Sequence, residues 1–75
     1  NDKIKFSIKE LFDYIQNADD IDEKYKCSQC LYNIFKSYYG DSLLPQCYID
    51  TINIIIKDEK SMKIRFKFMD ILERR

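Results

Sequence analysis

The chain has 75 residues, of which 45% are hydrophobic and 15% aromatic, and its 13 basic side chains balance 13 acidic ones. The hydrophobic content excludes an intrinsically disordered chain, and the single glycine and single proline argue against a turn-rich all-β fold. A net charge of zero gives no electrostatic argument for binding nucleic acid or a membrane. We therefore expect one small unit made of a few helices.

The cysteines and the apolar runs bear on localisation. Three cysteines cannot all pair within one chain, and no segment resembles a signal peptide. The longest uninterrupted apolar run, residues 54–56, is too short to cross a bilayer. We therefore expect a reducing setting, cytoplasmic by default with the nucleus as the alternative, and no membrane partner.

From residue 4 to about residue 17 the apolar side chains fall on one face of a helix, at spacings of four, three, one and three. Lys9 and Asp13 stand four residues apart on the other side and are expected to pair. The loop that follows contains Asp20 and Asp22, either of which can cap the next helix. The apolar stripe consists of Ile4, Ile8, Leu11, Phe12 and Ile15.

The second predicted helix extends to about residue 39 and is apolar on two faces. Gly40 follows it and is expected to adopt the αL conformation of a C-terminal cap. Tyr25, Tyr32 and Tyr39 recur every seven residues away from the core stripe, and they predict a second contact surface. The core stripe consists of Cys27, Cys30, Leu31, Ile34, Phe35 and Tyr38.

A third helix is expected to begin at Pro45, whose missing N–H has no intrahelical partner at the first position. The β-branched run 54–56 could form a strand, but the period from Tyr48 onward is helical and no partner strand is visible. Cys47 and Ile54 lie off the apolar stripe. That stripe consists of Tyr48, Ile49, Ile52, Ile55 and Ile56.

The last helix, expected after an N-cap at Ser61, is apolar on two opposite sides. One stripe is enough for a terminal helix in solvent, so a second one implies a surface that something covers. Arg65 lies on one flank between the stripes. The first stripe consists of Ile64, Phe68, Ile71 and Leu72, and the second of Met62, Phe66 and Met69. The other flank, expected in solvent, consists of Lys63, Lys67, Asp70 and Arg74.

Four helices joined by loops of about three to six residues predict an all-α fold of two consecutive antiparallel hairpins. A four-helix bundle would need only one apolar stripe on each helix. In an α-solenoid each hairpin also packs on the next one, so its helices carry additional apolar surface. The second stripes of the second and fourth helices therefore favour the solenoid.

The order of residues near the C-terminus is characteristic. It reads Ile64-Arg65-Phe66, then Asp70-Ile71-Leu72-Glu73, and ends in Arg75, and a lysine-rich connection at 55–61 precedes it. This order resembles the closing helix of the MIF4G domain, the HEAT-repeat domain of the translation initiation scaffold eIF4G and its relatives. The resemblance is fairly specific over residues 52–75. Earlier in the chain, only residues 5–12 resemble a helix of that family, through a Phe-x-x-x-Glu-Leu-Phe pattern.

The resemblance implies HEAT-like stacked hairpins, either as a single helical domain over residues 1–75 or as the C-terminal part of a MIF4G-like domain. It implies a non-catalytic scaffold of translation initiation that docks a DEAD-box RNA helicase of the eIF4A type and contacts RNA. Relatives of this family serve instead in mRNA decay, splicing or cap binding, and these alternatives stay open. The positions that match the family's motif are Arg65, Phe66 and Asp70.

Arginine use gives an independent indication. The chain has ten lysines but only three arginines, all in its last eleven residues, and arginine suits planar, bidentate or stacked contacts. We expect Arg65 to bind a carboxylate or a backbone carbonyl, and Arg74 and Arg75 to face an acidic protein surface or RNA phosphates. The expected partner-binding residues are Met62, Arg65, Phe66, Met69, Asp70 and Arg75, and those expected to contact RNA are Lys63, Lys67 and Arg74.

Each of these assignments has a structural alternative. Phe66 could pack against a neighbouring helix, and Asp70 could pair with Lys67 or Arg74 at helical spacing. The positive charge of the last turn would also suit the helix dipole without any partner.

Cys27 and Cys30 have the spacing of a zinc or redox motif, but the chain has no histidine and only Cys47 remains as a soft ligand. Both lie on the predicted core stripe, so we expect buried structural cysteines and no metal or cofactor. Without histidine or a phosphate-binding loop, we expect neither an enzyme nor a small-molecule substrate.

Two classes of function remain: a scaffold that binds a helicase or another protein, and a helical module that binds RNA directly. Binding to phosphates weakens steeply as salt rises, whereas docking on an apolar face is less sensitive to salt. A third alternative is a helical fragment whose second stripes are covered by further repeats.

Overall fold

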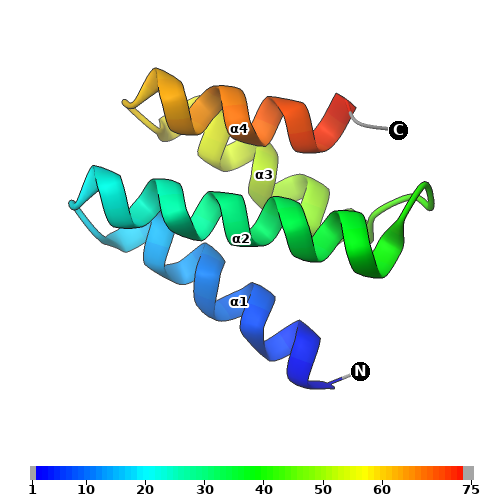
Figure 1. The fold of residues 1–75 in the computed structure, drawn as a ribbon. Coiled ribbons are helices and arrows are strands. Elements are labelled where there is room, and N and C mark those ends of the chain that lie inside the picture. Colours follow the sequence, from blue (N-terminus) through cyan, green and yellow to red (C-terminus); the bar gives the residue numbers. More distant parts are fainter. Residues whose placement is uncertain (1, 74–75) are drawn as a thin grey trace.

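The computed structural model describes residues 2–73, which form four α-helices (Figure 1). They are α1 (Asp2–Asn17), α2 (Ile21–Tyr39), α3 (Gln46–Asp58) and α4 (Met62–Glu73). No strand occurs among the described residues, and the run 54–56 is helical. The prediction of an all-α fold with about four helices is confirmed.

The helices form two antiparallel hairpins that pack on each other. α1 pairs with α2 and α3 pairs with α4, and α2 lies beside α4 and runs in the same direction (Figure 1). In an up-and-down bundle α4 would return along α1, whereas here it lies along α2. The α1–α2 and α3–α4 loops consequently lie at the same end of the molecule (Figure 1).

Local signals explain where α2 begins and ends. Asp20 is the N-cap, and its Oδ1 accepts hydrogen bonds from the N–H groups of Asp22 at 3.0 Å and Glu23 at 3.2 Å. Gly40 ends the helix with a positive φ of 57°, but its ψ of −126° is not that of the predicted αL cap. These angles and the hydrogen bond from the Ser42 N–H to the Tyr39 carbonyl at 2.9 Å instead fit a type II′ turn, which requires glycine at its first central position.

The starts of α3 and α4 also follow from the sequence. Pro45 is the N-cap of α3 rather than its first residue, because its ψ of 142° is extended, and its carbonyl accepts from Ile49 at 3.2 Å. Ser61 precedes α4 as predicted, and its Oγ accepts a long hydrogen bond of 3.5 Å from the Ile64 N–H.

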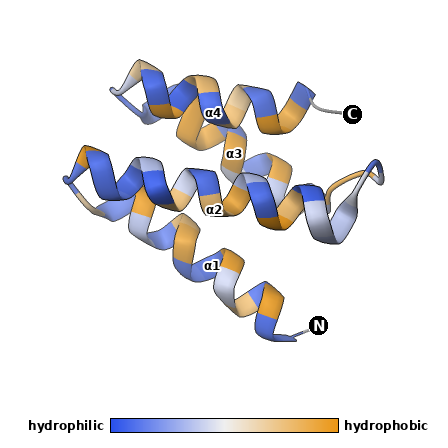
Figure 2. Ribbon diagram, viewed as in Figure 1, coloured by the Kyte–Doolittle hydropathy of each residue, from blue (hydrophilic) through white to orange (hydrophobic). Residues whose placement is uncertain are grey.

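The core lies between the two hairpins and is made by the predicted stripes of α1, α3 and α4, together with part of α2 and Leu44 from the α2–α3 loop. Hydrophobic segments alternate with hydrophilic ones along every helix (Figure 2). The buried hydrophobic residues are Ile8, Phe12, Ile15, Leu31, Phe35, Leu44, Ile52, Ile55, Ile64, Phe68 and Ile71.

The predicted core stripe of α2 is confirmed at Leu31 and Phe35, which are buried, and Cys27 and Ile34 pack partly against the core, but the stripe is wrong at its other two positions. Cys30 and Tyr38 are exposed, while Ser28, which the stripe omitted, is fully buried. The buried face runs through Ser28 because α2 must pack against α1 on one side and α4 on the other. The Ser28 hydroxyl is satisfied by donating to the Tyr25 carbonyl at 2.7 Å.

Two phenylalanines on opposite sides of α4 test this packing. Replacing the fully buried Phe68 by alanine is expected to lower the free energy of unfolding by about 3–5 kcal/mol, because it leaves a cavity. The matched control, Phe66→Ala, is expected to change it by less than about 0.5 kcal/mol, because Phe66 is exposed. Urea unfolding followed by circular dichroism measures both values. Equal losses would contradict the orientation of α4.

Candidate functional site

The second apolar stripe of α4 faces solvent. The side chains of Met62, Phe66 and Met69 are 50%, 54% and 36% exposed, although Ile64 and Phe68 of the same helix are fully buried. The helical period places the three on the side of α4 away from the core. We refer to Met62, Phe66 and Met69 as the outer face of α4.

Arg65 lies beside this face and forms contacts within the chain. Its Nε donates to the carbonyl oxygen of Ile56 at 2.8 Å, and its Nη1 lies 3.2 Å from the sulfur of Met62. Ile56 is in the last turn of α3, where backbone carbonyls lack intrahelical partners. The carbonyl contact expected of Arg65 is therefore made to its own hairpin.

The lysines on the other flank of α4 cover the tyrosine face of α2. The Nζ of Lys63 lies 4.1 Å from the ring centroid of Tyr25, and that of Lys67 lies 4.8 Å from the ring of Tyr32. Both tyrosine rings are half-buried against α4, so this second surface of α2 is covered within the chain. Lys63 is exposed as predicted, whereas Lys67 is only half-exposed, and α2 supplies a ring beneath each ammonium group.

The remaining predicted site residues do not belong to the outer face of α4 itself. Asp70 is exposed, and it has no ion-pair partner among residues 2–73, so the predicted pairing with Lys67 is absent there. Arg74 and Arg75, predicted to bind RNA and a partner, lie outside the described residues. The structure therefore brings together Met62, Arg65, Phe66 and Met69.

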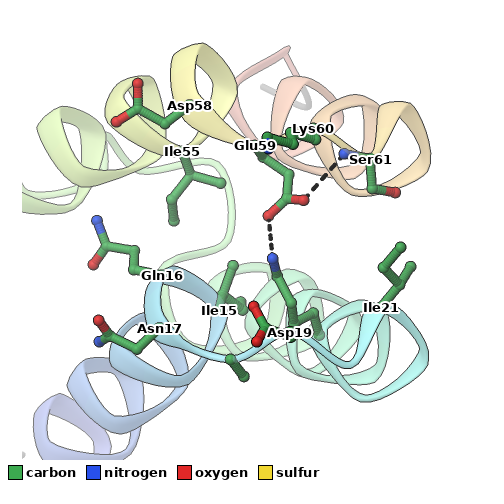
Figure 3. A pocket seen from close by; sticks show the side chains of 12 residues that line it. Ile15, Gln16, Asn17, Asp19, Ile21, Ile55, Asp58, Glu59, Lys60 and Ser61 are labelled. Carbon is green, nitrogen blue, oxygen red and sulfur yellow. Dashed lines mark hydrogen bonds and ion pairs between the residues drawn. The ribbon is translucent and has the colours of Figure 1, made fainter.

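A cleft of about 330 Å³ opens where the two loops meet (Figure 3). Across it, the Nζ of Lys24 in α2 lies 2.7 Å from Oε1 of Glu59 in the α3–α4 loop, with side chains only 12% and 8% exposed. Oε2 of Glu59 accepts from the Ser61 N–H at 3.1 Å, just before α4 begins. This largely buried pair joins the first hairpin to the start of the last helix.

The pKa of Glu59 reflects two opposing effects. Burial acts to raise its pKa, but hydrogen bonds from the Lys24 ammonium and the Ser61 N–H, with the Coulombic attraction of Lys24, outweigh burial and lower it below its ordinary value of 4.5. Lys24 and Glu59, the charged groups at the centre of the cleft, therefore pair with each other, and we assign them a role in stabilising the fold.

The cysteines do not form the buried pair that the sequence predicted. Cys30 is exposed and Cys27 is half-buried, and neither is in a disulfide. Burial raises the pKa of the Cys27 thiol, and nearby Cys30 and Glu23 add to this shift, so its reactive thiolate is disfavoured. Within residues 2–73, no three side chains of the metal-ligating types converge.

No helix in the described part of the chain has the length and apolar character needed to cross a bilayer. Comparison of the chain with protein-family models, curated proteins and solved structures finds no match.

The lowered pKa of Glu59 predicts an acid-sensitive contribution to stability. Because the folded-state pKa lies below the ordinary value, the contribution is complete above about pH 4.5 and is lost as pH falls through the folded-state pKa. At pH 7, Glu59→Gln should cost about 1.5–3 kcal/mol, since it removes a charged partner of Lys24.

Urea unfolding of the native chain and the Glu59→Gln variant between pH 7 and pH 3 measures this effect. The difference between the two should shrink as pH falls. A difference that is the same at pH 3 and pH 7 would contradict the assigned role of Glu59.

Proposed function

We propose that this chain is a non-catalytic helical scaffold whose outer face of α4 docks a DEAD-box RNA helicase of the eIF4A type. The observation that carries the proposal is the exposure of Met62, Phe66 and Met69 on a helix whose opposite side is fully buried. The resemblance of this segment to the closing helix of a MIF4G domain supplies the identity of the partner.

The chemistry of the outer face suits a protein partner. Phe66 offers an aromatic anchor of the kind found at the centre of interfaces, and the two flanking methionines adapt their shape to an apposed surface. Asp70, one turn beyond Phe66, is exposed and adds a charge at the edge of the face. An apolar centre with a charged rim is the usual anatomy of a protein interface.

The proposal places the chain in the cytoplasm, in keeping with its free cysteines. The alternative is a MIF4G-like scaffold that acts in mRNA decay, splicing or cap binding.

Binding of the chain to an eIF4A-type helicase, measured by pull-down and calorimetry, tests the proposal. Phe66→Ala is expected to weaken binding about 30-fold, or about 2 kcal/mol, because it removes the central anchor. Phe6→Ala is the matched control, since Phe6 is 64% exposed on α1 and should leave binding unchanged. Equal binding by the native chain and the Phe66→Ala variant would contradict the proposal.

Direct RNA binding is a second candidate, favoured by the lysines that lie over tyrosine rings between α2 and α4. Lys63 and Lys67 hold two positive charges one helical turn apart over the rings of Tyr25 and Tyr32, and ammonium groups placed in this way are suited to contact phosphates.

Salt dependence separates the two candidates. Docking on the outer face of α4 is expected to change less than about threefold between 50 and 200 mM salt, because the contact is apolar. RNA binding would weaken steeply over this range, and Lys67→Met would reduce the salt slope by about one. Titration of a fluorescent single-stranded RNA at several salt concentrations measures this slope. Undetectable RNA binding at low salt would eliminate the second candidate.

A further inference from the structure

Arg65 connects the two helices of the second hairpin. Its side chain starts from α4, reaches the carbonyl of Ile56 at the end of α3, and also contacts Met62 one turn earlier in α4. The guanidinium group is suited to this because its donors point in fixed, coplanar directions.

The contact with Ile56 fixes the position of the guanidinium. Ile56 lies in the last turn of α3, and the preceding carbonyl, that of Ile55, already accepts from the Glu59 N–H at 2.8 Å. The Nε of Arg65 supplies the next donor, and at 2.8 Å this bond has good geometry. The half-buried position of Arg65 protects the bond from water.

The contact with Met62 restrains a side chain of the outer face of α4. A methionine side chain has three rotatable bonds and no fixed shape of its own. Its sulfur is a weak acceptor, but here it faces an Nη1 donor at 3.2 Å whose position is already set by Ile56. Met69, at the other end of the same face, has no such donor among the described residues.

We infer that Arg65 is a positioning residue for the outer face of α4: it holds the Met62 side chain in one conformation. Arg65 itself does not bind the partner. The effect of Arg65 on helicase binding rests on the proposed function, whereas its effect on the conformation of Met62 does not. Ordering Met62 before the partner arrives removes part of the entropy cost of docking, because one flexible side chain is already immobilised.

The two methionines of the chain provide a direct test without any partner. In the full chain labelled with ¹³C at the methionine methyl groups, the Met62 methyl is expected to have the higher order parameter. Arg65→Ala should lower that of Met62 and shift its resonance, and leave Met69 unchanged. If Met62 and Met69 are equally mobile in the native chain, or if Arg65→Ala changes neither, the inference is overturned.

A second variant, Arg65→Lys, keeps the test valid if the alanine variant folds poorly. Lysine keeps the positive charge but cannot donate in two fixed directions to Ile56 and Met62, so Met62 is expected to become as mobile as in the alanine variant. If Met62 is as ordered in the lysine variant as in the native chain, the inference is overturned.

Coupling between the two residues in helicase binding completes the test. Arg65→Ala should weaken binding about fivefold when Met62 is present, but less than about twofold when Met62 is already leucine, since leucine has no sulfur to hold. Equal losses in both backgrounds would overturn the positioning role. A helicase that does not bind the native chain would refute the proposed function, and the methyl measurements would still decide the role of Arg65.

Discussion

The packing of the molecule depends on the ring of Phe12. Its centroid lies 6.2 Å from that of Phe35 in α2, 6.1 Å from that of Tyr48 in α3, and 6.3 Å from that of Phe68 in α4. One side chain of α1 therefore contacts each of the other three helices, and aromatic pairs at these distances are favourable. Because Phe68 must face Phe12, α4 is oriented about its axis with Met62, Phe66 and Met69 outward.

Two polar contacts complete the arrangement at the end where the loops meet. The largely buried pair of Lys24 and Glu59 joins α2 to the α3–α4 loop, and Arg65 joins α4 to the last turn of α3. Breaking a buried pair by removing one partner is costly, because the other charge is left without compensation. These two contacts fix the position of the start of α4, where Met62 lies, relative to α2 and α3.

The helices and the outer face of α4 could be predicted because each depends on local periodicity. Phe66 and Phe68 are two residues apart, so a helix must place them on different sides whatever packs against it. The face of α2 could not be placed correctly, since its centre is Ser28, a small polar residue that hydrophobic patterning ignores. Serine is tolerated there because its hydroxyl bonds to the Tyr25 carbonyl.

The polar contacts between the helices could not be predicted from the sequence, for a different reason. Spacing rules identify ion pairs within one helix, such as Lys9 and Asp13, which lie 3.3 Å apart and exposed. Lys24 and Glu59 belong to different hairpins, and nothing in their local sequence marks them as partners. The ring contacts of Lys63 and Lys67 could not be predicted for the same reason, because the tyrosines beneath them belong to α2.

The most direct test of the outer face of α4 as a docking surface is an NMR titration of the labelled chain with an eIF4A-type helicase. The methyl resonances of Met62 and Met69 and the ring resonances of Phe66 should shift first, while those of Tyr25 and Tyr32 stay in place. Shifts confined to the two tyrosines, with the methionine methyls unchanged, would contradict docking on this face.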